Sequence, residues 1–262
     1  MDRTDTKNSF DAAGRQHRIA ISLKKKVYQM SISGNIGEIR ARIAAAAEKA
    51  GRSPDEIMLV AATKMNDSAA VREAVSGGVD ACGENRVQEL QQKNAENAYA
   101  GAPLYFIGHL QKNKVKYLVG VVDLIQSVDS MELIRLIDRR AESVGAVQDI
   151  LLEVNIGREE AKSGLMKESL DDVLAQAGQF PHVHIRGLMA IPPADYDPER
   201  TRPYFKEMKQ LFIDIDHKKY DNVSMDFLSM GMTHDYETAI EEGSNMVRIG
   251  TGIFGERNYG TT

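Results

Sequence analysis

Short apolar segments alternate with helix-like segments along almost the whole chain, and this alternation constrains the fold more than any other feature. The apolar segments have the length of strands, whereas the segments between them carry apolar residues at helical spacing. The predicted strands cover residues 57–63, 79–85, 104–110, 121–129, 147–157, 183–193, 224–233 and 245–255. The predicted helices cover residues 37–51, 67–78, 86–97, 111–120, 130–145, 167–180, 198–215 and 234–243.

Strands that are apolar throughout, without strict alternation, indicate burial on both faces, as in a parallel sheet. An eight-fold repeat over about 230 residues is typical of an α/β fold with a single (β/α)8 TIM barrel, and a doubly wound open sheet is the alternative. We therefore predict one TIM-barrel domain over residues 30–262. Residues 1–29 are predicted to be a disordered N-terminal extension, because charged and polar segments bury too little surface to fold.

The charge of the chain is uneven and excludes some classes of function. Residues 1–30 carry a net charge of +4, whereas the remainder carries −9. The acidic remainder of the chain lacks the excess of basic residues that is typical of a nucleic-acid-binding protein. The chain also lacks an apolar run of the roughly 20 residues that span a bilayer. Its single cysteine, Cys82, excludes an intrachain disulfide and is typical of the reducing cytoplasm, where we expect the protein to reside.

The carboxyl ends of the predicted strands are the places where a barrel gathers its functional residues. Polar residues at these ends are Thr63, Lys64, Glu84, Asn85, His109, Ser127, Asn155, Ser229 and Arg248. Lys64 follows an apolar strand, and a lysine that is partly desolvated in a barrel mouth becomes a nucleophile for carbonyl groups. The alternative is that Lys64 extends its ammonium group into solvent.

Two loops rich in small residues follow the last two predicted strands, at residues 229–233 and 248–255. Barrels commonly bind phosphate in this place through backbone N–H groups and a helix N-terminus. The alternative is that the glycines merely permit tight turns. Together with a carbonyl-capturing Lys64, the two loops indicate a phosphorylated aldehyde or ketone as ligand.

Several long segments closely resemble those of the pyridoxal phosphate homeostasis proteins: they read "LVAATK", "GGVDACGENRVQEL", "YFIGHLQKNK", "IRGLMAI" and "LSMGMTHDYETAIEEGSNMVRIGTGIFG". The resemblance covers residues 30–255. These proteins are single-domain relatives of the barrel half of alanine racemase. The resemblance therefore implies the alanine racemase N-terminal-domain type of barrel (PLP fold type III), with pyridoxal 5′-phosphate (PLP) as cofactor.

The resemblance also implies roles for individual residues. Lys64 matches the lysine that forms the internal aldimine with PLP, and Arg248 matches the arginine that faces the pyridine nitrogen. The positions that match the surroundings of the phosphate are Ser229, Thr233, Gly250 and Thr251, and those that line the ring are Asn85 and Met230. Because an arginine only donates hydrogen bonds, it would leave the ring nitrogen unprotonated and the cofactor a weaker electron sink.

The function implied by the resemblance is the homeostasis of vitamin B6 and PLP, in which a monomer holds PLP without catalytic residues or turnover. PLP-dependent apo-enzymes are then the candidate partners. A PLP-dependent amino-acid racemase is the alternative, and a Schiff-base aldolase acting on phosphosugars is a third hypothesis. Racemases of this type add a β-rich domain with a catalytic tyrosine, and only seven residues follow Gly255. Reversal of configuration at Cα is hard without a second base.

Two further features are expected to be structural. Cys82 lies within a predicted strand and is expected to be a buried small residue. His182 and His184 alternate along another predicted strand without a third ligand nearby, so we expect no zinc site. We therefore predict no metal and no partner among nucleic acids or membranes.

Overall fold

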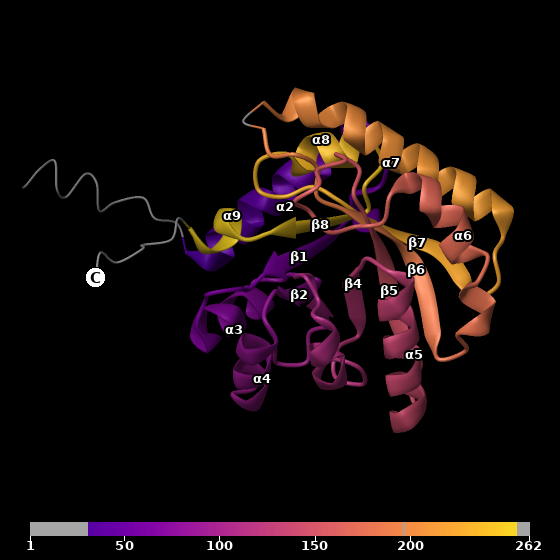
Figure 1. The fold of residues 1–262 in the computed structure, drawn as a ribbon. Helices are drawn as coiled ribbons and strands as arrows, with labels where there is room; N and C mark the ends of the chain where they lie inside the picture. The colour runs from indigo at the N-terminus through magenta and orange to yellow at the C-terminus, as the bar shows by residue number, and fades with distance from the viewer. Residues whose placement is uncertain (1–30, 196, 256–262) are drawn as a thin grey trace, which may run out of the picture. The chain divides into compact units, whose positions relative to one another are not determined.

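The chain forms a closed barrel of eight parallel strands surrounded by helices, in a computed structural model that describes residues 31–195 and 197–255 (Figure 1). Each strand pairs with the next along the chain, and β8 pairs with β1 to close the barrel. The strands are β1 (Met58–Ala62), β2 (Ala81–Glu84), β3 (Leu104–Phe106), β4 (Leu124–Val128), β5 (Gln148–Val154), β6 (Val183–Ala190), β7 (Val223–Ser229) and β8 (Met246–Ile249). The predicted TIM barrel is confirmed, and the doubly wound sheet is wrong.

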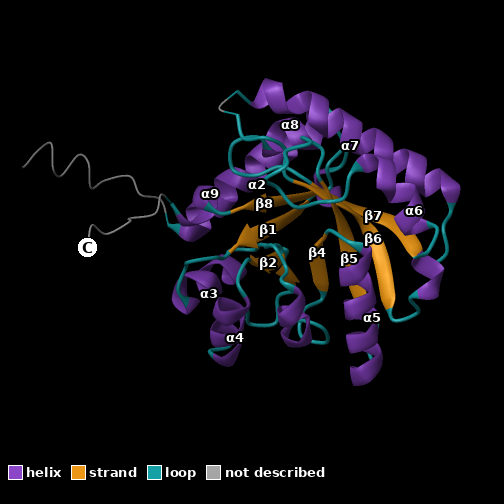
Figure 2. Cartoon of the chain, in the orientation of Figure 1, coloured by secondary structure: helices purple, strands orange, loops and turns teal. Residues whose placement is uncertain are grey.

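Helical segments connect consecutive strands on the outside of the barrel (Figure 2). The α-helices are α2 (Ile32–Lys49), α3 (Ser68–Ser76), α4 (Val87–Ala95), α5 (Met131–Val144), α6 (Leu170–Leu174), α7 (Pro198–Lys218), α8 (Tyr236–Glu241) and α9 (Thr251–Phe254). The 3₁₀ helices are η1 (Pro54–Glu56), η2 (Lys112–Tyr117), η3 (Lys167–Ser169) and η4 (Ala177–Gln179).

Two of the predicted helices differ in the structure. The segment 111–120 forms only the 3₁₀ helix η2, because four of its first six residues are exposed and leave little apolar surface to pack a full α-helix. The segment 167–180 breaks into η3, α6 and η4, with Gly178 inside its last turn. Short helical pieces at these two connections leave the strand order unchanged.

The apolar core has an inner and an outer layer. The inside of the barrel is filled by Val60, Ala62, Ala81, Tyr105, Ile107, Leu124, Leu151, Met189 and Met246. The outer layers lie between strands and helices and contain the alternate residues of the same strands, such as Leu59 and Ala61 of β1. Cys82 belongs to an outer layer and is completely buried, as predicted. Burial raises the pKa of its thiol to about 12, so the thiol is not ionised near neutral pH.

Helix α2 covers the seam where β8 meets β1. Its Ile36, Ile39 and Ile43 are buried against β1, β8, α8 and α9 in one apolar cluster. Figure 1 shows α2 beside α8 and α9 at this seam. The helix begins five residues before the predicted start at residue 37, because Ile36 contributes to the same cluster.

The predicted extension of residues 1–29 lies outside the described residues. Among the helices of residues 31–195 and 197–255, none has the length and apolar character needed to cross a membrane. The same part of the chain contains no group of three or more His, Cys, Asp or Glu side chains arranged to hold a metal ion.

Candidate functional site

Lys64 lies at the mouth of the barrel, two residues beyond the end of β1. The side chains of Val60 and Ala62 belong to the cluster inside the barrel, and strand alternation places Lys64 on the same inward side. The backbone that follows is held in a turn: Met65 has a left-handed φ of 62° and donates its N–H to Glu89 at 2.6 Å. The lysine thus extends from a fixed backbone, with its side chain partly buried.

A buried ion pair supports the strand end that carries this lysine. Glu84 ends β2, is completely buried, and lies 2.6 Å from Nζ of Lys93 on α4. The hydroxyl of Thr63 donates to Oε1 of Glu84 at 2.6 Å, and the carbonyl of Thr63 accepts from Lys93 at 2.8 Å. The hydroxyl of Tyr99 donates to the same carboxylate oxygen at 3.3 Å. The residue before Lys64 is therefore fixed on both its side chain and its backbone.

Arg248 is buried inside the barrel on β8. Its Nη1 donates to the hydroxyl of Ser229 at 2.5 Å, and its Nη2 donates to the carbonyl of Ala190 at 3.0 Å. Ser229 in turn donates to Oε1 of Gln126 at 2.7 Å. Within the described part of the chain, the guanidinium has only these neutral hydrogen-bond partners and no carboxylate at ion-pair distance.

Burial lowers the pKa of Arg248 to about 10, while the carboxyl groups of Glu153 and Asp235 act in the opposite direction. The guanidinium therefore stays protonated near neutral pH and can only donate hydrogen bonds. Burial also raises the pKa of Glu153 and of Asp235 above the usual range of carboxyl groups. The centre of the barrel thus contains a charged hydrogen-bond donor, and burying its charge without a negatively charged partner costs free energy.

The loops after β7 and β8 meet through two threonine hydroxyls. Oγ1 of Thr251 donates to Oγ1 of Thr233 at 3.2 Å, and the N–H of Gly252 donates to the same oxygen at 3.4 Å. Gly250 directly precedes Thr251, and a Cβ on Gly250 would lie 3.4 Å from the carbonyl oxygen of Ala62. The turn therefore packs directly against the end of β1, beside the strand end that bears the lysine.

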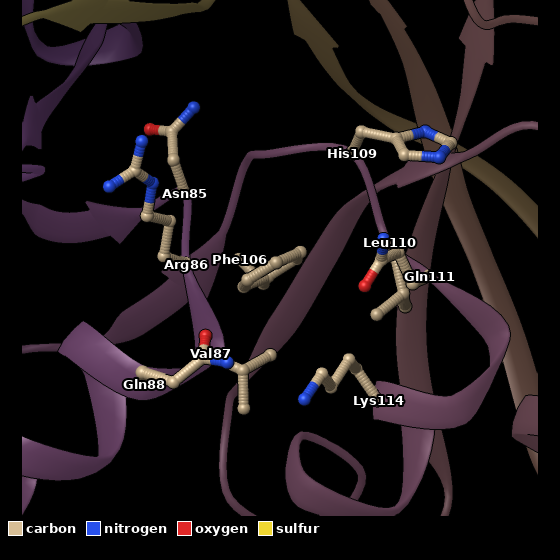
Figure 3. Close-up of a pocket in the computed structure, with 9 residues that line it drawn as sticks. All are labelled: Asn85, Arg86, Val87, Gln88, Phe106, His109, Leu110, Gln111 and Lys114. Atoms are coloured by element: carbon tan, nitrogen blue, oxygen red, sulfur yellow. The ribbon is translucent and has the colours of Figure 1, made fainter.

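A cavity of about 190 Å³ opens between α4 and the loop after β3 (Figure 3). Figure 3 shows Asn85 and His109 on opposite sides of it, with Phe106 between them. Oδ1 of Asn85 is buried and has no hydrogen-bond partner among the described residues. The two loops can approach because residue 108 is glycine: a Cβ on Gly108 would lie 2.3 Å from the carbonyl oxygen of Asn85.

A second cavity, of about 290 Å³, lies in the barrel mouth and shares Asn85 and His109 with the first. Glu153, on the inward side of β5, also lines it, as do Ile107 and Ile191. Its lining comes from the segments that end or follow β2, β3, β5 and β6.

Most of the residues predicted from the sequence lie at this one end of the barrel. Two of them lie deeper than expected. Met230 is completely buried and packs with Ala239 in the outer core, and the hydroxyl of Ser229 contacts Arg248 and Gln126 instead of the threonine pair. Their predicted roles at the ring and the phosphate stay predictions.

Sequence reasoning missed three residues that the structure places in or behind the site: Lys93, Gln126 and Glu153. Glu153 had a local signal, since it stands two residues before the strand-end Asn155 in "LLEVN" and shares its side of the strand. Lys93 had none, because it lies in a polar helix and meets Glu84 only through the packing of α4 on β2.

Comparisons with known proteins identify the family of this barrel. Residues 35–258 match the family model of the alanine racemase N-terminal domain. A pyridoxal phosphate homeostasis protein from Aquifex aeolicus is 43% identical over 230 residues, which are 88% of this chain and 100% of the relative. The chain belongs to the pyridoxal phosphate homeostasis protein family.

Solved structures of similar proteins agree with this assignment. PipY from Synechococcus elongatus, solved with PLP bound, is 33% identical to this chain, with a TM-score of 0.71. The match covers 81% of this chain and 100% of PipY. An alanine racemase from Clostridium difficile, at 14% identity and a TM-score of 0.67, supports the fold alone, and the match covers 57% of its length.

Proposed function

We propose that this homeostasis protein binds PLP through an imine bond to Lys64 and holds it without turnover of its own. Residues 30–262 are the proposed PLP-binding domain, and the protein is proposed to act as a monomer that supplies PLP-dependent apo-enzymes. The observation that carries the proposal is the bound PLP in PipY, whose whole length matches 81% of this chain.

The chemistry of the donor groups supports PLP as the ligand. A phosphate requires several hydrogen-bond donors, and the hydroxyls of Thr233 and Thr251 meet beside the N–H of Gly252 at the end of the barrel. The guanidinium of Arg248 offers a buried donor for a ring nitrogen. Lys64 extends from the adjacent strand end, so one ligand with a phosphate, a ring and an aldehyde fits the three groups.

The partner of the ring nitrogen determines what PLP can do. PLP supplies an electron sink, and the sink is strongest when a carboxylate keeps the ring nitrogen protonated. Arg248 is charged and can only donate, so it would keep a ring nitrogen beside it unprotonated. This arrangement favours retention of the cofactor over the loss of a proton from a bound amino acid.

The covalent bond to Lys64 can be tested directly. PLP in an imine with lysine absorbs visible light, so the purified protein is expected to be yellow and to lose this band after borohydride reduction. Mass spectrometry of the reduced protein is expected to find the adduct on the peptide that contains Lys64. Lys64→Ala should abolish the adduct at this position, whereas Lys162→Ala, at the rim of the mouth, should preserve it.

Two results would contradict this function. A colourless protein that takes up no PLP would exclude both PLP homeostasis and a PLP-dependent racemase. Racemisation of D- or L-alanine by the PLP-loaded protein would instead favour the enzyme over a protein that only holds its cofactor.

The threonine pair provides a second test. Removal of a donor to a charged phosphate costs about 1.5–3 kcal/mol, so Thr251→Ala is expected to speed the dissociation of PLP at least about tenfold. His182→Ala is the control, because His182 precedes β6 and thus lies at the opposite end of the barrel. Dialysis followed by absorbance measures the retained PLP, and equal retention in the two variants would argue against the assigned phosphate site.

A further inference from the structure

Glu153 is a buried carboxyl group that the proposed function does not use. It is 8% exposed, lies on the inward side of β5, and lines the cavity of about 290 Å³ in the barrel mouth. No hydrogen bond or ion pair joins its carboxyl group to another described residue. A buried carboxylate without a donor is costly, and such a group facing a cavity indicates a ligand that brings the donor.

The basic side chains that line this cavity already lie beside carboxylates. Lys162 pairs with Glu159 at the rim and also donates to the carbonyl of Pro192 at 3.3 Å. Nδ1 of His109 lies 3.6 Å from Oδ2 of Asp129. These pairs leave the carboxyl group of the buried glutamate as the cavity's one charged group without a direct partner among the described residues.

The other residues that line the cavity suit a ligand with a hydrogen-bond donor at the end of an alkyl chain. Asn85 lines the same cavity, and its Oδ1 is a second buried acceptor without a hydrogen-bond partner in the described part of the chain. Ile107 and Ile191 provide apolar wall. A group with several N–H donors, a positive charge and a short apolar chain satisfies all of these features.

We propose that this cavity binds an alkylammonium group, with Glu153 as its counter-ion and Asn85 as a second acceptor. The cavity discriminates against an amine that carries an α-carboxylate, because the carboxylate would enter beside a buried carboxylate. The ligand is either a free alkylamine or the side chain of a lysine in a polypeptide. The site does not require bound PLP, so amine binding can be tested separately from the proposed function.

The charged groups around Glu153 determine the effect of pH on this site. Burial raises the pKa of Glu153 most, Asp129 after β4 raises it further, and Arg248 from β8 and His109 after β3 lower it. The carboxylate form binds the ammonium, so affinity is expected to increase as the pH rises through this elevated pKa. It should fall again only when the amine itself loses its proton, near pH 10.

Cofactor-free protein labelled with ¹⁵N allows the proposal to be tested by NMR titration. n-Butylamine, Nα-acetyl-lysine methylamide, L-alanine and butyrate serve as probes at neutral pH. The amide signals of Ile107, Val154 and Ile191 are expected to shift with n-butylamine, and at least about tenfold less affinity is expected for L-alanine and butyrate. Binding of the lysine derivative as well would identify a polypeptide lysine as an allowed source, whereas binding of butylamine alone would restrict the site to free amines.

Glu153→Gln is the decisive variant, because it removes the charge and preserves the shape. It is expected to weaken n-butylamine binding at least about tenfold and to abolish the pH dependence. Glu132→Gln is the matched control. Glu132 lies at the start of α5 and is an exposed carboxylate that pairs with Lys112. The thermal unfolding midpoint of each variant verifies its fold. Absence of butylamine binding, equal binding of butyrate, or unchanged binding in Glu153→Gln would overturn the proposal.

Discussion

A Lys93→Met variant is expected to lose about 3–5 kcal/mol of its free energy of unfolding, because it would leave the carboxylate of Glu84 buried without a counter-ion. The pair is among the most buried in the described residues: Glu84 is completely buried, and Nζ of Lys93 lies 2.6 Å from it. Methionine preserves an unbranched side chain, so the loss would come from the charge and not from packing. Urea denaturation followed by circular dichroism measures it.

Two controls separate the ion pair from a general effect of losing a lysine. Lys116→Met changes an exposed lysine of the same charge and is expected to alter stability by less than about 0.5 kcal/mol. The double variant Glu84→Gln/Lys93→Met removes both charges and is expected to regain much of the loss. A single Lys93→Met variant as stable as the unmodified protein would contradict the role given to the pair.

An Arg248→Met variant is expected to lose PLP at least about tenfold faster without any loss of stability in the cofactor-free protein. A charge-assisted hydrogen bond contributes about 1.5–3 kcal/mol, which sets the size of the effect on retention. The guanidinium is fully buried with neutral partners, and burial lowers its pKa to about 10. A buried charge without an ion-pair partner costs free energy, and an apolar side chain in its place removes that cost.

Arg186→Met provides the matched control with the opposite expected pattern. Arg186 lies on β6 and forms ion pairs with Asp149, at 2.6 Å, and with Asp226. Its removal should lower stability and leave PLP retention unchanged. Thermal unfolding of the cofactor-free proteins and absorbance after dialysis measure the two effects. A loss of stability in Arg248→Met equal to that in Arg186→Met would show that Arg248 is a structural residue.

The barrel could be predicted because its signals are local. Each strand is a short apolar run that ends in a loop, and the order of strands and helices allows few topologies. The connections at 111–120 and 167–180 were predicted less well. Segment 111–120 has helical spacing in the sequence but little apolar surface to pack, and packing decides whether a short helix forms. Segment 167–180 buries Leu170, Val173, Leu174, Ala177 and Phe180, yet it is divided into three short helical pieces, with Gly178 in the last of them.

The end of the barrel that carries the candidate site was also predictable, since Lys64, Asn85, Arg248 and Thr251 all lie at or just after the carboxyl ends of strands. The depth of individual side chains was not. Ser229 and Met230 are neighbours in the sequence, yet one contacts Arg248 inside the barrel and the other packs in the outer core. Which face each side chain takes depends on the register, and a slip of one residue exchanges the two faces.

The sequence by itself therefore determined the eight-fold alternation, the family, and the position of Lys64 at the end of a buried strand. Only the tertiary structure decided which groups meet around it. The contacts of Glu84 with Lys93, and the isolation of Glu153 in the barrel mouth, arise from elements that pack on one another across the fold. Composition and spacing report where a residue stands along the chain, whereas the energy of a buried charge depends on what surrounds it in space.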